Sequence, residues 1–485
     1  MQRTANRAPV GRAAPEERVC ELVAERIRAS GLWEAPGEQP DRRRTHLVSP
    51  EPFALGPDTV RFLRDIGPAL LAFYSAANDL YLHAGHEWVG EYLDIGKPED
   101  VVRHAAMRYQ RRSLPAVIRP DVLLTPEGPV ITELDSVPGG IGHLDCLSAA
   151  YEDLGFELIG SPRGVRDAFA AMLKEAASKV DPVCAIVVSD ESADYAPEMA
   201  YLAGELRGVG VSAHQVGPRD IAFTEEGLYL GAGRERRRID VVYRFFELFD
   251  LPNIPKSELI SYAARKKLAA ITPPYKHFLE EKLLLALLHS EMLREYWTAA
   301  MGERTYLLLT RAICPTFILD NRPVPPHARI SGFEWRGRPI RDWREIKSGT
   351  QKERRLALKP SGFSELSWGS RGLRIGHDMS QEDWGEAVEH ALAEFERSPW
   401  VLQPFREASR WGLKYYDEAS AGLRDMDARV RLCPYYLVFD GKAELAGVLA
   451  TACPKDKKAI HGMVDAVMAP CSAAVGSPQH PSTGE

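Results

Sequence analysis

Residues 119–135, RPDVLLTPEGPVITELD, decide the fold because they read as two short strands around a Pro-Glu-Gly turn. If this hairpin is symmetric about its turn, Asp121 lies opposite Glu133 and Arg119 lies opposite Asp135. Since side chains alternate between the two faces of a strand, these four residues share one face. The other face carries the residues that we expect to be buried, which are Val122, Leu124, Val130, Thr132 and Leu134.

The shared face gathers three acids beside one arginine. Directly opposed side chains lie roughly 4.5 to 5.5 Å apart at Cβ, and like charges placed in this way destabilise a sheet. A cation would remove that penalty, and Mg2+ prefers oxygen ligands, typically one or two carboxylates together with phosphates and water. We therefore predict a metal-nucleotide site with Asp121, Glu133 and Asp135 as metal ligands. The alternative is a solvated strand face with a surface ion pair.

A lysine and a glycine-rich loop follow an apolar strand in residues 356–373, LALKPSGFSELSWGSRGL. Such a loop brings backbone N–H groups close to phosphate oxygens, while Lys359 supplies a positive charge. The predicted nucleotide contacts of this segment are Lys359, Ser361, Gly362, Gly369 and Ser370. The segment is neither a Walker A sequence nor a dinucleotide-binding fingerprint, and a glycine-rich surface loop is the alternative.

Two further segments add candidate nucleotide contacts. Lys282 stands at the polar start of the otherwise apolar helix 278–288, where an ordinary i,i+4 pairing would also explain it. Gln403 lies in WVLQPF, residues 400–405, a short apolar strand that Pro404 ends. Main-chain groups of this strand can bind the edge of an adenine, although an ordinary core strand has the same pattern.

Composition favours small-molecule chemistry. The chain has 485 residues, 45% of them apolar and 27% charged, with a formal net charge of -7. This length favours two or three packed lobes, and a mildly acidic chain has no bulk attraction for nucleic acid or anionic lipid. Seven scattered cysteines without metal-like spacing are expected to be reduced thiols. Without an apolar segment that could span a membrane, we expect a cytoplasmic protein.

The periodicity of apolar residues divides the chain into four regions. A run of short strands and a helix between residues 184 and 216 predicts parallel pairing, and Asp440-Gly441 predicts a type I′ hairpin turn. Asp58 can cap a long amino-terminal helix. The expected regions are a mainly helical part at 1–115, the metal-ligand hairpin with a small α/β lobe at 116–265, nucleotide-binding lobes at 266–471, and a disordered tail at 472–485.

Together these segments resemble the ATP-grasp ligases, and specifically the circularly permuted branch typified by the glutathionylspermidine synthase family. In that branch the metal-binding acids precede the lysines and the glycine-rich loop, which is their order here. The family pattern of Arg, Asp, Glu and Asn falls on Arg119, Asp121, Glu133 and Asp135, with Asp in place of the final Asn. The resemblance covers about residues 115–470 and implies an α/β (α+β) fold of ATP-grasp type in permuted order.

The resemblance implies ATP and Mg2+ as cofactors and a reaction that joins a carboxylic acid to an amine. Lys282, Lys359 and Gln403 match family positions that contact ATP, and Arg119 would stabilise charge in the transition state. An arginine of the closing strands, either Arg429 or Arg431, would face the phosphates or the acid substrate. The implied partners are a small-molecule or peptide carboxylate and an amine, with no nucleic acid and no membrane.

Three other functions remain open at this stage. A kinase on the same scaffold would stop at a phosphorylated product, and a nucleotide-binding module would not turn over at all. A hydrolase using His143 and Ser136 is disfavoured because the sequence has no GxSxG turn around a nucleophile.

Overall fold

The computed structural model describes residues 14–33, 46–83, 85–135, 137–231, 233–325, 327–367, 371–457, 460 and 465–474, and it is a mixed α/β structure. Parts of the predicted features lie outside the described residues, namely residues 1–13 of the expected helical part, Ser136, Gly369, Ser370 and the tail from residue 475. The tail was predicted to begin at residue 472, but a strand continues to Ala473.

Helices dominate the first 115 residues. They are α1 (Glu16–Ala29), α2 (Pro57–Leu82), α3 (Glu87–Leu93) and α4 (Glu99–Ala105), with the short strand β1 (Phe53–Leu55) before α2. The prediction that Asp58 caps α2 is wrong, because Gly56 is the N-cap residue and Pro57 opens the helix. Proline suits this first position because its missing N–H would have no partner there, and Asp58 still complements the helix dipole from the first turn.

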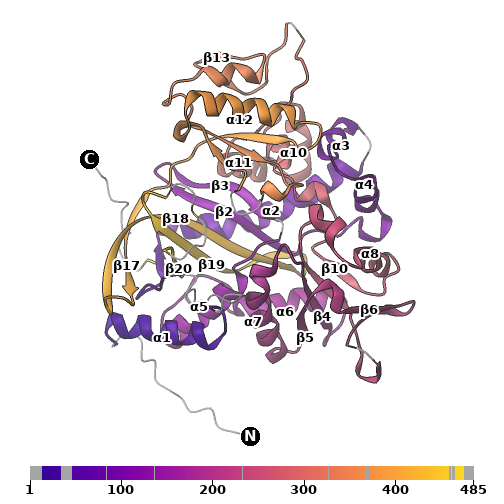
Figure 1. The fold of residues 1–485 in the computed structure, drawn as a ribbon, viewed down its shortest axis with the longest axis vertical. Helices are drawn as coiled ribbons and strands as arrows, with labels where there is room; N and C mark the ends of the chain where they lie inside the picture. Colours follow the sequence, from indigo (N-terminus) through magenta and orange to yellow (C-terminus); the bar gives the residue numbers. More distant parts are fainter. Residues whose placement is uncertain are drawn as a thin grey trace.

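A large sheet forms the centre of the molecule (Figure 1). Its strand order is β1-β20-β19-β18-β2-β3, and β17 adds to the outer part of β18. The bounds are β2 (Val117–Thr125), β3 (Gly128–Asp135), β17 (Arg410–Asp417), β18 (Gly422–Phe439), β19 (Lys442–Pro454) and β20 (Val467–Ala473). The predicted turn between β18 and β19 is confirmed, since Asp440 and Gly441 both have positive φ, at 49° and 68°.

Helices cover both faces of this sheet. On one face α2 packs with α10 (Arg294–Met301) and α11 (Glu303–Ala312) around a core that includes Val122, Ile131 and Tyr436. On the other face α1, α5 (Ile141–Asp153) and α6 (Gly164–Ala177) enclose Cys433, Tyr435 and Leu437. Because apolar groups on both faces are removed from water, the sheet is the main site of hydrophobic stabilisation.

The small α/β lobe has the predicted parallel pairing. Its sheet has the order β10-β9-β4-β5 with every neighbour parallel. The strands are β4 (Val183–Val188), β5 (Ser212–Val216), β9 (Val241–Phe245) and β10 (Ala270–Thr272), and α7 (Ala196–Gly208) and α8 (Ser257–Arg265) complete the unit. A small antiparallel sheet of β6 (Ile221–Thr224), β7 (Gly227–Leu230) and β8 (Arg237–Arg238) extends from it.

A further lobe lies at the top of Figure 1 around α12 (Gln381–Ala393). Its antiparallel sheet has the order β11-β16-β14-β15, with the hairpin β12-β13 beside it. The strands are β11 (Phe317–Ile318), β12 (Glu334–Trp335), β13 (Arg338–Pro339), β14 (Leu356–Pro360), β15 (Arg374–Ile375) and β16 (Trp400–Pro404). The predicted helix 278–288 is shorter than expected, because α9 spans only Leu283–Leu288 after a 3-10 turn at His277–Leu279.

The cysteines agree with the prediction of reduced thiols, since all seven are buried and free. Among the described residues, the helices include none that combines the length and the apolar character needed to cross a lipid bilayer.

Candidate active site

The β2–β3 hairpin pairs its charged residues as predicted. Asp121 lies opposite Glu133, and Arg119 lies opposite Asp135. The register then shifts at a β-bulge, so that Val122 pairs with Ile131. A bulge places one extra residue in one strand and changes which side chains point to each face.

The bulge overturns part of the predicted buried face. Ile131, which is fully buried, takes the place expected for Val130 and Thr132, and these two are only half-buried. The bulge also leaves the backbone carbonyl of Thr132 outside the ladder, where side chains from another lobe reach it. Sequence periodicity could not have found this irregularity, because a one-residue insertion does not alter the composition of the strand.

Two arginines hold the Asp121 carboxylate. Arg119 Nη2 lies 3.0 Å from Oδ1, and Arg431 Nη1 donates to Oδ2 at 2.8 Å. Burial would raise the pKa of Asp121, but these two guanidinium groups outweigh it and leave the pKa below its ordinary value. Of the two candidate arginines of β18, Arg431 contacts an acid of this hairpin, whereas Arg429 pairs with Glu407 at 2.8 Å.

Asp135 completes this group from the end of β3. Its carboxylate pairs with Arg119, and Oδ1 accepts a hydrogen bond from the backbone N–H of Val137 at 3.1 Å. Burial raises the pKa of Asp135, and the nearby charges of Asp121 and Glu133 raise it further despite Arg119. Asp135 is therefore the more easily protonated of the two aspartates.

Lys282 reaches the same hairpin from the turn before α9. Its Nζ lies 2.8 Å from Glu133 Oε1 and donates to the carbonyl of Ser361 at 2.9 Å. Burial lowers the pKa of this lysine, but the Glu133 carboxylate more than reverses the effect and raises it. Lys282 is thus a buried, charged link between the acid strands and the glycine-rich loop.

Lys359 and Gln403 come from the neighbouring strands β14 and β16 and meet at the bulge. Lys359 Nζ donates to the Thr132 carbonyl at 3.3 Å, and Gln403 Nε2 donates to the same oxygen at 3.2 Å. Burial lowers the pKa of Lys359, and the positive charge of Lys282 adds to this effect although Glu133 opposes it. We name the seven charged residues gathered here the acid–base cluster: Arg119, Asp121, Glu133, Asp135, Lys282, Lys359 and Arg431.

The glycine-rich loop is anchored by an acid that the sequence analysis did not select. Glu281 accepts hydrogen bonds from Ser361 Oγ and, at 3.1 Å, from the backbone N–H of Gly362. A Cβ atom at Gly362 would lie only 2.1 Å from the Glu280 carbonyl oxygen, so only glycine allows this approach. The predicted phosphate contact Gly362 therefore has a packing role in the described structure.

Glu281 is in turn paired with a lysine of the amino-terminal region. Lys97 Nζ lies 2.7 Å from Glu281 Oε1, and both side chains are 1% exposed. Burial would raise the pKa of Glu281, but Lys97 holds it below its ordinary value. No local sequence signal marks Lys97, because it is a single lysine after a turn and its partner is far along the chain.

A second buried pair, Arg244 with Glu280, lies next to this network. Arg244 is fully buried, and it donates to the backbone carbonyls of Phe246 at 2.6 Å and Pro273 at 3.3 Å. Burial raises the pKa of Glu280 to about 8 even though Arg244 opposes that shift. A signal for Arg244 does exist in the sequence, since a lone arginine inside the apolar run VVYRFF requires a buried partner.

The donor set fits a metal bound together with phosphate groups. Among the residues that the structure describes, no group of three His, Cys, Asp or Glu side chains is assembled for a metal ion. Asp121 and Glu133 instead face arginine and lysine groups. Because Mg2+ commonly combines one or two carboxylates with phosphate oxygens and water, a nucleotide would supply the ligands that these acids do not.

Comparison with known proteins supports the fold. No protein-family model matches the chain, and no curated protein matches it. Among solved structures, a glutathione synthetase-like effector from Globodera pallida has a TM-score of 0.59 at 12% identity, covering 95% of this chain and 98% of that chain. The two chains share a fold. The "Putative gamma-glutamylcysteine synthetase" of Methylobacillus flagellatus KT has a TM-score of 0.38 at 9% identity, covering 80% of this chain and 83% of that one.

Proposed function

We propose that this protein is an ATP- and Mg2+-dependent ligase that joins a carboxylic acid to an amine. The observation that carries the proposal is the convergence of two lysines from other segments on the β2–β3 hairpin, where Lys282 pairs with Glu133 and Lys359 donates to the Thr132 carbonyl. The fold shared with a glutathione synthetase-like protein supports it. The order of the segments, with the acids before both lysines, supports a circularly permuted ATP-grasp arrangement. Membership of the glutathionylspermidine synthase family stays a prediction.

Each charged group has a role in this proposal. Lys282 and Lys359 would bind phosphate oxygens of ATP, with Lys282 exchanging Glu133 for phosphate when the nucleotide enters. Asp121, Glu133 and Asp135 would hold Mg2+, which would neutralise phosphate charge. The strand that contains Gln403 would contact the adenine. Burial lowers the pKa of Lys359 and so disfavours its charged form. An incoming phosphate would stabilise that charged form.

The reaction would proceed in two displacements. An oxygen of the substrate carboxylate attacks the γ-phosphorus of ATP, and ADP leaves to give an acyl phosphate. The amine nitrogen then attacks the acyl carbon, phosphate leaves, and the nitrogen gives up a proton to form the amide. Arg119 and Arg431 converge on Asp121 and would stabilise the negative charge that develops on the transferred phosphoryl group.

A screen of substrate pairs tests this function. Small carboxylic acids and peptides are offered with amino acids and polyamines, ADP release is followed by a coupled assay, and products are identified by mass spectrometry. We expect ADP release that requires Mg2+ and both substrates, with an amide as the product. ADP release with an acid alone, ending in a stable phosphorylated product, would indicate a kinase and contradict the proposal.

A further inference from the structure

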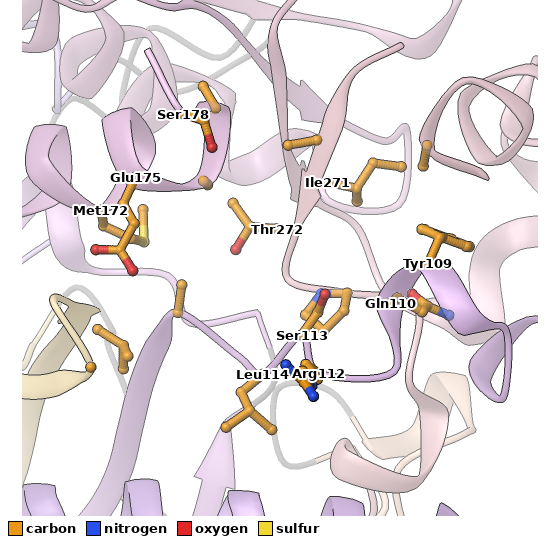
Figure 2. Close-up of a pocket in the computed structure, with 18 of the residues that line it drawn as sticks. Tyr109, Gln110, Arg112, Ser113, Leu114, Met172, Glu175, Ser178, Ile271 and Thr272 are labelled. Atoms are coloured by element: carbon orange, nitrogen blue, oxygen red, sulfur yellow. The ribbon is translucent and has the colours of Figure 1, made fainter. Parts of the chain in front are cut away.

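A large cavity lies apart from the acid–base cluster (Figure 2). Its volume is about 1290 Å³, and it is bounded by α2, the segment 109–116, the end of α6 and β10. None of the seven residues of the acid–base cluster lines it. Ligand sites commonly occur where lobes meet and have volumes of roughly 300 to 1,000 Å3, so this space is sufficient for a small molecule.

The charges that line the cavity are mostly positive. Five basic residues contribute to it, namely Arg112, Lys179, Arg238, Lys267 and Lys442, against the two acids Glu175 and Asp240. This local excess contrasts with the net charge of -7 for the chain. The five basic residues come from separate segments of the chain, and all of them are exposed.

Both acids are already engaged within the protein. Asp240 pairs with Lys179 at 2.7 Å, and Glu175 accepts a hydrogen bond from the backbone N–H of Asp440 at 2.6 Å. Among the described residues, the other four basic side chains of the cavity have no carboxylate partner. Positive charges that share a concave surface repel one another, and an anion bound between them would remove that repulsion.

The side chain of Thr272 gives a second indication. Thr272 at the end of β10 is 5% exposed and lines the cavity, and Figure 2 shows its side chain between Glu175 and Arg112. Within the described part of the chain, this hydroxyl makes no hydrogen bond with another protein group. The hydroxyl oxygen is not among the buried side-chain atoms that lack a partner, so it is accessible from the cavity, and a ligand oxygen there could accept its hydrogen bond.

We propose that this cavity binds a small molecule that carries at least two anionic groups. The unpaired cations would neutralise the anionic groups, and the hydroxyl of Thr272 would donate a hydrogen bond to one of their oxygens. The apolar part of the ligand would contact the uncharged lining, which includes Leu71, Leu114, Met172 and Ile271. This site and its ligand are independent of the nucleotide chemistry proposed for the acid–base cluster.

Calorimetric titration of the full chain with citrate and, separately, with tripolyphosphate tests the proposal. Magnesium-free buffer of low ionic strength keeps charge screening small. The double variant Arg112→Gln, Lys267→Gln should weaken binding by on the order of tenfold, and Thr272→Val by about threefold to tenfold. Binding of citrate alone would indicate a carboxylate ligand, and binding of tripolyphosphate alone a phosphate ligand; either result supports the proposal.

Two control variants separate this cavity from other sources of anion binding. Arg304→Gln with Lys352→Gln removes two exposed charges elsewhere and should leave the affinity unchanged. Lys359→Gln removes a proposed phosphate contact of the acid–base cluster, so the titrations are repeated in this background, where the cavity variants should still weaken the binding that remains. Thermal unfolding checks that each variant is folded. The proposal is overturned if neither anion binds in the Lys359→Gln background, or if the binding seen there is unchanged in the cavity variants. No ATP turnover is measured, so failure here leaves the ligase proposal untouched.

Discussion

At the scale of single residues, Glu133 is the acid on which the proposed metal site depends most directly. Glu133→Gln preserves the size of the side chain but removes the charge that faces Lys282 at 2.8 Å. We expect Mg2+-dependent ADP release to fall by about 10²- to 10³-fold. The assay is the coupled ADP measurement, and circular dichroism checks the fold.

The same hairpin provides a matched control for Glu133. Glu127 is exposed at the turn between β2 and β3, so Glu127→Gln removes one charge without touching the cluster. Its activity should match that of the unmodified protein. Full turnover by the Glu133→Gln variant would remove this residue from the proposed metal ligands.

The low pKa of Asp121 predicts an acid-dependent loss of stability. A carboxyl group whose pKa is lowered by folding stabilises the folded state at pH values above its unfolded pKa, about 3.9, and this contribution disappears as the pH falls through the folded pKa. The difference in unfolding free energy between the unmodified protein and Asp121→Asn should therefore be large at pH 7 and shrink below pH 4. Urea titrations at several pH values measure it.

The exposed Asp58 provides the comparison for this experiment, since its side chain is 90% exposed and forms an ion pair with Arg61. Asp58→Asn should change the unfolding free energy little at any pH. A difference for Asp121→Asn that stays constant from pH 7 to pH 3 would contradict the assigned ion pairs.

A contact between two residues could be predicted from the sequence only where the two residues lie close together along the chain. The pairing of Asp121 with Glu133 follows from a short hairpin, and a turn sequence sets its register. The ion pair of Lys97 with Glu281 joins two segments that only the completed fold brings together. Sequence periodicity predicts which face of a strand a residue occupies. It predicts neither the β-bulge nor a contact with a residue from a distant segment.

At the scale of elements, the turn after α3 supports the glycine-rich loop through Lys97. Lys97→Met would leave Glu281 as a buried, unpaired carboxylate, which costs about 3 to 5 kcal/mol in such sites. We expect a matching loss of unfolding free energy and a higher KM for ATP, because Glu281 holds Ser361 and Gly362. Denaturant titration and steady-state kinetics measure these two quantities.

The double variant Lys97→Met, Glu281→Met distinguishes the two effects. Removing both charges should restore much of the stability, because no uncompensated charge stays buried. The KM for ATP should remain high, since the loop has lost its acceptor. If stability is not restored relative to the single Lys97→Met variant, the ion pair is not the cause of the loss.

Close packing at Gly362 gives a further prediction for the same loop. Gly362→Ala would place a Cβ atom 2.1 Å from a backbone carbonyl, so the loop must move away from the turn before α9. We expect lower thermal stability and ATP turnover reduced by about tenfold or more. The control is Gly412→Ala in β17, where no atom lies within 4 Å of the added Cβ, and this variant should behave like the unmodified protein.

At the scale of the whole molecule, the amino-terminal region is part of the central core. Gly67 of α2 allows the ring of Tyr436 to pack directly against the helix, and the Tyr436 hydroxyl donates to the Leu63 carbonyl at 2.6 Å. A chain that begins at residue 116 would lose α2 from one face of the large sheet and α1 from the other. We expect calorimetry to show no cooperative thermal unfolding of this shortened chain. A sharp unfolding transition like that of the full chain would contradict this expectation.

The pairing of β1 with β20 has a consequence for how the protein is made. Phe53 near the start of the chain pairs with Cys471 near its end, in parallel register. During synthesis the early strand must therefore wait until residues 467–473 have left the ribosome before it can pair with its neighbour. Completion of the central sheet is accordingly a late event, and the partly built nascent chain carries an open apolar edge that chaperones would need to shield.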